Sequence, residues 1–272
     1  MDFKLNGIDY DFVIKECFLG YQYRKVRKQL YSADSDIPKK LIALYFSNDE
    51  RADLDCLKDA FIKKYIKNEC ALENVHNTEE KEGMKCMYEY MHTSEEEFDI
   101  YSLLDYHRLL YASTPYSEFG GHFRRGPAYL NNASIELCSW QYIWQLVKEL
   151  DLPVRELIKN GSKIKNNMTI DKLLDYVKKC VMIKCSLIKI HPFADGNGRT
   201  IRCFLNKLFG IAGIPPVYIK EKEREEYHIA MQQAIAENNY EPIVQFYYYK
   251  ICDSIIELDI NERLKEEKTK SL

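Results

Sequence analysis

Residues 191–199 bring together the side-chain types that phosphate-transfer chemistry needs, in the order His-Pro-Phe-Ala-Asp-Gly-Asn-Gly-Arg. His191 is the one side chain of this run that readily accepts a proton near neutral pH. Asp195 offers a hard oxygen ligand for Mg²⁺. Gly196 and Gly198 leave backbone N–H groups open to an anion at the start of a following helix. The run predicts metal-assisted transfer to a hydroxyl that His191 deprotonates.

Two arginines extend this pattern into the next helix. Arg199 falls in its first turn and Arg202, three residues later, shares the same side, so the pair suits a polyphosphate. Pro192 stiffens the backbone after the histidine, and Phe193 can anchor the run in the core. A Walker-type loop is excluded, because Phe193 stands where a glycine is required and arginine replaces the lysine.

The same residues also allow interpretations in which they have only a structural role. An isolated histidine at a helix end is usually structural, and Gly-Asn-Gly alone is usually a turn. A zinc site at His191 and Asp195 lacks an H-E-x-x-H partner.

The elements around the run are predicted to be helical, because glycine and proline are few and apolar residues recur every three or four positions. Leu54, Leu57, Phe61 and Tyr65 share one helical face. Ser94-Glu95-Glu96-Glu97 has the form of a capping box and predicts a helix start and a domain boundary. Thr169 is the expected N-cap of a helix that runs through Leu187. Further helices are predicted over residues 135–150, 199–209, 222–237 and 241–258.

The composition limits the class of protein. The 272 residues are 46 % hydrophobic and 30 % charged, and 39 basic against 42 acidic residues give a net charge of −3, so no nucleic acid is expected as a partner. Nine scattered cysteines without a C-x-x-C pair predict reduced thiols. No membrane span or leader is apparent, which predicts a cytoplasmic protein.

The order of residues 191–199, completed by Arg202, resembles the H-P-F-x-[D/E]-G-N-G-R signature of the Fic family. The likeness continues at residues 106–110, 121–124, 200–206 and 212–216 and covers about residues 96–255. It implies an all-α, Fic-type helical core with a short β-hairpin flap, preceded by an N-terminal helical region. The implied domains are residues 1–95, the catalytic core at 96–258 and a polar C-terminal tail at 259–272.

The resemblance also implies an activity: transfer of AMP from MgATP to a Ser, Thr or Tyr hydroxyl of a target protein, with self-modification. His191 would be the general base and Asp195 the magnesium ligand. The nucleotide would be bound by the backbone at Gly196 and Gly198, by Asn197 at the α-phosphate, and by Arg199 and Arg202 at the outer phosphates.

The flap is expected between Gly121 and Leu130, with Gly126-Pro127 near its tip, and would hold the target by strand addition. Its docking residues would be Gly121, His122, Phe123 and Arg124. The alternative to a docking role is that Arg124 and Arg125 are charges of the flap that face solvent.

Residues 69–74, Glu-Cys-Ala-Leu-Glu-Asn, resemble the family's inhibitory motif [S/T]-x-x-x-E-[G/N], with Glu69 in place of the hydroxyl residue. Glu73 would then form a salt bridge with Arg202 and restrain the enzyme. Asn74 favours the left-handed conformation that ends a helix, which places Glu73 in the last turn.

Other activities stay open beside this interpretation. Removal of AMP from a target, transfer of another phosphate-containing group, and a nucleotide-binding toxin–antitoxin module without turnover are the alternatives. The target, the modified residue type and the oligomeric state are not encoded in these motifs.

Overall fold

The computed structural model describes residues 4–5, 8–9, 39, 42, 46, 58–129, 135–166 and 169–270. These residues are helical or irregular apart from one antiparallel pair, β1 (Lys4–Leu5) with β2 (Ile8–Asp9). The α-helices of these residues are α4 (Lys58–Glu73), α5 (Thr78–Thr93), α6 (Ser102–Tyr111), α7 (Ile143–Glu149), α8 (Asp151–Asn166), α9 (Ile170–Ile190), α10 (Asn197–Ile211), α11 (Arg224–Glu237) and α12 (Glu241–Lys270). Leu54, Leu57 and Leu130 lie outside the described residues.

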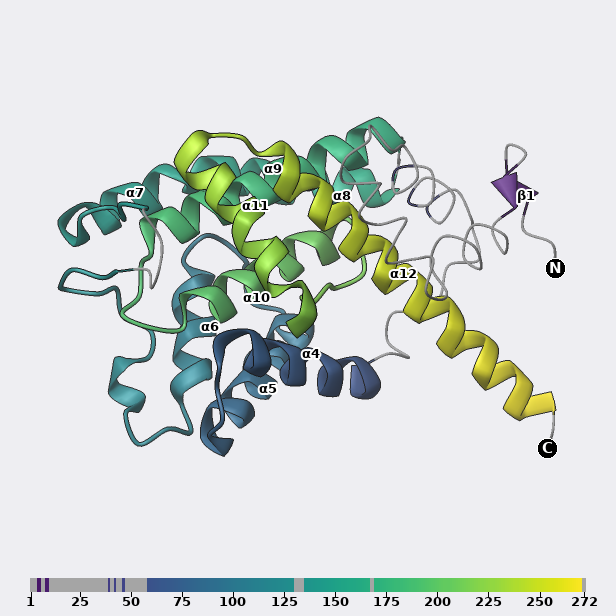
Figure 1. Cartoon of the computed structure of the whole chain (residues 1–272), viewed down its shortest axis with the longest axis horizontal. Helices are drawn as coiled ribbons and strands as arrows, with labels where there is room; N and C mark the ends of the chain where they lie inside the picture. Colours follow the sequence, from purple (N-terminus) through teal and green to yellow (C-terminus); the bar gives the residue numbers. More distant parts are fainter. Residues whose placement is uncertain are drawn as a thin grey trace.

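Helix α10 lies at the centre of the molecule and packs against α4, α5, α6, α8 and α9 (Figure 1). Its apolar residues Ile201, Phe204, Leu205 and Leu208 are each at most 1 % exposed. Each such side chain contributes about 1.5–3 kcal/mol when removed from water, so this face fixes the helix in place. The first turn of α10, which carries the end of the motif from Asn197 to Arg199, is therefore held in a buried helix.

The predicted helix that Thr169 precedes is confirmed as α9. It ends at Ile190 because His191 adopts a left-handed conformation with φ 50° and its N–H donates to Leu187 O. Helices were also correctly predicted at α10, α11 and α12, although α12 continues to Lys270 and extends away from the other helices (Figure 1). The predicted tail at residues 259–272 is thus helical as far as residue 270.

Two predicted helix starts are wrong. Ser94 follows the end of α5, where its N–H donates to Tyr90 O, and it opens no helix. Helix α6 begins at Ser102 instead, because Asp99 Oδ1 accepts hydrogen bonds from the N–H groups of Tyr101 and Ser102 at 2.8 and 3.2 Å. The helix predicted from Ile135 begins later, with the 3₁₀ turn η4 (Trp140–Tyr142) followed by α7.

The flap region contains no strand over residues 118–129, where the 3₁₀ turn η3 (Ser117–Phe119) is followed by turns and irregular chain. Residues 130–134 lie outside the described part of the chain, so the hairpin stays a prediction. The seven described cysteines are free thiols. Among the described helices, none combines the length and the apolar character that crossing a bilayer requires.

Candidate active site

The predicted site residues His191, Asp195 and Gly196 lie on the loop between α9 and α10, and the others, Asn197, Gly198, Arg199 and Arg202, lie in the first turns of α10. The backbone of the loop is left-handed at both ends, with φ 50° at His191 and φ 72° at Gly196. Glycine is required at position 196, because a Cβ on this left-handed residue would also lie 2.9 Å from Tyr111 Oη and from Leu110 Cδ2. Gly196 caps α10, so the free N–H groups of the first turn point out of the helix N-terminus, where an anion is favoured.

Phe193 and Asn197 hold this loop in shape from the inside. The Phe193 ring is completely buried. The Asn197 side chain accepts a hydrogen bond from Phe193 N at 2.9 Å and donates one to Phe193 O at 2.8 Å. Phe193 is thus the anchor that the sequence predicted, and Asn197 closes the turn behind it. The contact of Asn197 with an α-phosphate stays a prediction.

His107 of α6 connects the loop to the start of the flap. Its ring stacks on Phe193 with the centroids 3.8 Å apart and the planes 5° from parallel. Nδ1 accepts a hydrogen bond from Gly121 N at 2.9 Å, so the neutral ring carries its proton on Nε2, which donates to Asp195 O at 3.0 Å. Burial lowers the pKa of His107 to about 4, which keeps the ring neutral and both bonds in place.

His191 and Asp195 have the properties that their predicted roles require. Burial lowers the pKa of His191 below its ordinary value, so the imidazole is neutral and able to accept a proton at pH 7. The Asp195 side chain is 79 % exposed, and its Oδ2 accepts a hydrogen bond from the Tyr111 hydroxyl at 2.9 Å. One accessible carboxylate beside a helix N-terminus suits Mg²⁺, which is held mainly by phosphate and water oxygens.

Arg199 is buried and faces carboxylates. Its Nη1 pairs with Glu80 of α5, and its Nη2 donates to the Tyr111 hydroxyl at 3.2 Å. Burial opposes ionisation of Glu80, but hydrogen bonds from Arg199 and Asn77 outweigh it and lower the Glu80 pKa. Arg199 is thus neutralised by an acid from outside the motif.

Arg202 is paired with two acids from α4. Glu73 Oε1 lies 2.6 Å from Arg202 Nη2, so the contact that the sequence predicted between these residues is present. Helix α4 ends at Glu73 because Asn74 adopts φ 60°, also as predicted. Glu69, fully buried one turn earlier, contacts the same guanidinium at 2.6 Å. Both motif arginines therefore face carboxylates of the N-terminal helices.

The four predicted flap residues have different environments. His122 is exposed, whereas Phe123 packs against Phe193 with ring centroids 5.9 Å apart. Arg124 is only 7 % exposed and donates short hydrogen bonds to three carbonyls, at 2.7 Å to His191, 2.6 Å to Gly126 and 2.6 Å to Cys138, and a longer one of 3.4 Å to Ile190. The alternative of a solvated charge is therefore wrong for Arg124, but Arg125 is exposed.

Sequence reasoning missed four residues around the motif: Glu69, Glu80, His107 and Tyr111. The sequence contains signals for two of them. Glu69 precedes Glu73 by four positions and so shares its helical face, and Glu80 follows the helix cap Asn77 by three. His107 and Tyr111 carry no comparable signal for their contacts with Asp195, because Asp195 is 84 or more positions away along the chain.

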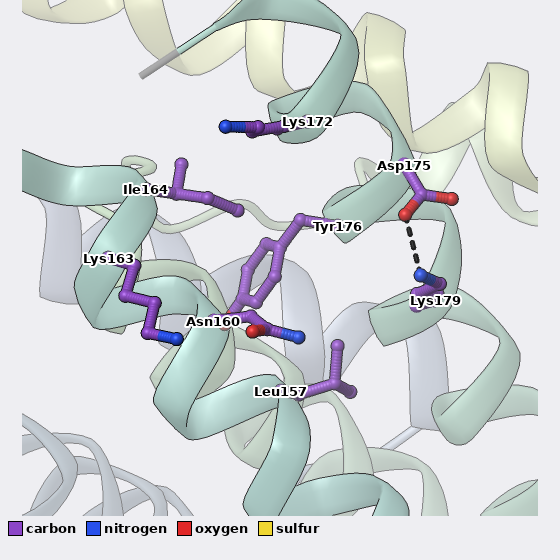
Figure 2. Close-up of a pocket in the computed structure, with 8 residues that line it drawn as sticks. All are labelled: Leu157, Asn160, Lys163, Ile164, Lys172, Asp175, Tyr176 and Lys179. Atoms are coloured by element: carbon purple, nitrogen blue, oxygen red, sulfur yellow. Dashed lines mark ion pairs between the residues drawn. The ribbon is translucent and has the colours of Figure 1, made fainter. Parts of the chain in front are cut away.

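A pocket of about 580 Å³ lies between α8 and α9, apart from the motif residues (Figure 2). Leu157, Ile164 and the ring of Tyr176 form its apolar wall. Asp175 and Lys179 at its edge are paired at 2.6 Å. None of the predicted catalytic, nucleotide-binding or metal-binding residues lines this pocket.

Comparisons with known proteins agree with the helical fold. Solved structures with similar folds include Fic-1 from C. elegans, with a TM-score of 0.63, 18 % identity, and coverage of 90 % of this chain and 77 % of that one. A Fic-domain signalling protein from Bacteroides thetaiotaomicron also gives 0.63, at 17 % identity, with 81 % of this chain and 94 % of that one covered.

Curated relatives match a shorter stretch. The protein adenylyltransferase Fic of Aedes aegypti is 44 % identical over 70 residues, or 26 % of this chain and 14 % of its own length. The protein of that name from Nematostella vectensis is 38 % identical over 63 residues, which are 23 % of this chain and 15 % of its own. The model of the Fic/DOC family matches residues 97–209. Residues 97–209 of this chain are therefore similar to the Fic/DOC family.

Proposed function

We propose that this chain transfers AMP from ATP to a hydroxyl group of a protein side chain, with release of pyrophosphate. The observation that carries the proposal is the loop between α9 and α10. It places a neutral, half-buried His191 and an accessible Asp195 beside the N-terminus of a buried helix. The matched relatives, which are named protein adenylyltransferases, favour the same reaction.

In this mechanism His191 accepts the proton of the attacking hydroxyl while the oxygen forms a bond to the α-phosphorus. The bond between that phosphorus and the oxygen bridging to the β-phosphate breaks, and pyrophosphate leaves. Asp195 would hold Mg²⁺, which neutralises phosphate charge when bound. The N–H groups at the start of α10 stabilise the negative charge that develops at the α-phosphate.

Glu73 is proposed to restrain this reaction. Burial raises the pKa of Glu73, but the charge and hydrogen bond of Arg202 outweigh it and lower the pKa, so the carboxylate is ionised at neutral pH. It also lies against the motif, because a Cβ at Gly198 would be 3.1 Å from Glu73 Cδ and 2.8 Å from Arg202 Nη1. An ionised carboxylate in this place competes with the outer phosphates of ATP for Arg202.

The target polypeptide is proposed to bind beside Phe123, at the flap, by adding a strand. Phe123 contacts both Phe193 of the motif loop and Trp144 of α7, so a peptide bound there would lie next to His191. Self-modification and the use of Mg²⁺ belong to the same proposal.

The test is a labelling assay with purified full-length protein, Mg²⁺ and ATP labelled at the α-phosphate. The Glu73→Gly variant should label itself or added proteins faster than the parent. If the Glu73 pair is worth about 1.5–2 kcal/mol, at the lower end for a charged hydrogen bond since the side chain is 35 % exposed, the rate should rise about 10–30-fold.

Two controls define the result. His191→Ala in the Glu73→Gly background should abolish labelling. Glu79→Gln removes one exposed acid six positions away and should leave the parent rate unchanged. If label is transferred only from ATP labelled at the γ-phosphate, the protein transfers phosphate and not AMP. Tight ATP binding without any transfer would favour a nucleotide-binding module.

A further inference from the structure

Glu69 is the feature of the site that the proposed function leaves unexplained. It lies in the interior of α4, is 0 % exposed, and contacts Arg202 through both carboxylate oxygens. Arg202 Nε lies 3.0 Å from Oε1 and 2.7 Å from Oε2, and Nη2 lies 2.6 Å from Oε2. This is a two-point pairing along one edge of the guanidinium, which fixes its plane as well as its position.

Glu73 binds the same arginine in a different way. It makes one contact, from Oε1 to Nη2 at 2.6 Å, and its side chain is 35 % exposed. It is the last residue of α4, and Asn74 with φ 60° turns the chain away after it. Rotation of its side chain is therefore sufficient to withdraw Glu73, whereas Glu69 is enclosed by packed helices.

The nitrogens of the Arg202 guanidinium face different groups: the two acids on one side and the motif on the other. Its Nε edge faces Glu69, and its Nη1 lies over the start of α10, 2.8 Å from where a Cβ of Gly198 would be. Among the described residues, no carboxylate accepts a hydrogen bond from Nη1. Nη1 is thus directed toward the helix N-terminus, where the phosphates of the proposed substrate would lie.

Charge favours different roles for the two acids. Arg202 is 5 % exposed and faces both acids. Burial raises the pKa of Glu69 in spite of the neighbouring Arg202, whereas Arg202 lowers the pKa of Glu73, so Glu73 supplies the negative charge that repels phosphate here. Removal of Glu73 leaves Arg202 with Glu69 as its only partner among the described acids. Loss of Glu69 instead would leave a buried arginine held at one point only, free to turn its Nη1 away from α10.

We propose that Glu69 is a positioning residue: it holds the edge of Arg202 formed by Nε and Nη2 so that, once Glu73 has left, Nη1 faces the outer phosphates of ATP. The inference rests on the proposed function for the identity of the nucleotide. It distinguishes Glu69 from a second inhibitory acid, which would raise activity when removed.

The experiment compares nucleotide affinities in the Glu73→Gly background, measured by calorimetry on full-length protein with ATP and with AMP. Glu69→Gln should weaken ATP binding about tenfold, the effect of losing one charged hydrogen-bond contact, and leave AMP binding unchanged. AMP lacks the outer phosphates and so does not depend on Arg202. Glu69→Asp keeps the charge but shortens the side chain, and should restore part of the ATP affinity.

Three outcomes overturn the proposal. Equal loss of ATP and AMP affinity in both variants would make Glu69 a structural support of the fold. Unchanged affinities would make it irrelevant to the site. Faster labelling by Glu69→Gln with Glu73 intact would make it a second inhibitory acid. Failure of the proposed function would look different, because ATP and AMP could still bind with the predicted difference while no AMP was transferred to protein.

Discussion

Arg124 gives the sharpest test of how the flap is connected to the motif loop. Its guanidinium is 7 % exposed and donates three hydrogen bonds of 2.6–2.7 Å to the main-chain carbonyls of His191, Gly126 and Cys138. Each bond contributes about 1–1.5 kcal/mol net, so Arg124→Ala should destabilise the protein by about 3–4 kcal/mol. For a chain of this size the unfolding midpoint should fall by about 6–16 °C.

The neighbouring Arg125 provides a matched control. Its side chain is exposed, so Arg125→Ala should change stability by less than about 0.5 kcal/mol. Arg124→Lys keeps the charge, but one ammonium group cannot reach three carbonyls. Its loss of stability should therefore be smaller than that of Arg124→Ala and larger than that of Arg125→Ala. Thermal unfolding followed by circular dichroism compares the three variants. Equal midpoints for Arg124→Ala and Arg125→Ala would refute the role assigned to these carbonyl contacts.

Arg124→Ala should also act on the chemistry. The carbonyl that it holds belongs to His191, whose left-handed backbone sets the direction of the imidazole. Small displacements of a reacting group cost about 100-fold in rate, so labelling by Arg124→Ala in the Glu73→Gly background should fall by about 10–100-fold. It should be measured below the unfolding midpoint, where the protein is folded.

Three further predictions concern charge. Burial lowers the pKa of His191, so the acid limb of kcat/KM for the Glu73→Gly variant should have its midpoint below pH 6.5; a midpoint above that value contradicts the assigned base. His107 has a pKa of about 4 in the folded protein and about 6.5 in the unfolded chain, so the unfolded chain takes up the proton first as the pH falls. The free energy of unfolding should therefore decrease by about 1.4 kcal/mol for each unit by which the pH falls from about 6.5 to about 4. Urea unfolding of the parent and of His107→Gln at each pH measures this decrease. Glu80→Gln removes the buried ion-pair partner of Arg199 and leaves only the exposed Asp195 at 3.6 Å, so the free energy of unfolding should fall by about 2–4 kcal/mol. The control variant Glu79→Gln should not change it.

The parts of the site that could be predicted from sequence are those whose residues lie close together in the chain. The loop after α9, the anchor Phe193 and the end of α4 at Asn74 follow from local rules on left-handed backbone and helix termini. Ser94 shows the limit of such rules, because its capping-box pattern also occurs just after a helix end. Asp99, which does cap α6, has the same local chemistry, and only tertiary packing selects between them.

Long-range partners could not be predicted in this way. No periodicity distinguishes Arg124 from Arg125, yet Arg124 is buried and donates to the carbonyl of His191, 67 positions away, whereas Arg125 is exposed. Helix α8 was not expected at all. It contains Gly161, which lies so close to Tyr176 that a Cβ would be 2.7 Å from the hydroxyl, so packing stabilises a helix that local propensity weakens.

The acids that face Arg199 and Arg202 suggest why restraint and catalysis can share one site. Glu69, Glu73 and Glu80 come from two helices that precede the motif, and they supply the negative charge that buried arginines require in the absence of nucleotide. Glu73, the most exposed of the three, makes a single-point contact with Arg202, so phosphate oxygens can replace it without leaving either arginine unpaired. The two better buried acids would then keep the arginines paired and oriented during that exchange, and the fold would not have to open for the proposed enzyme to become active.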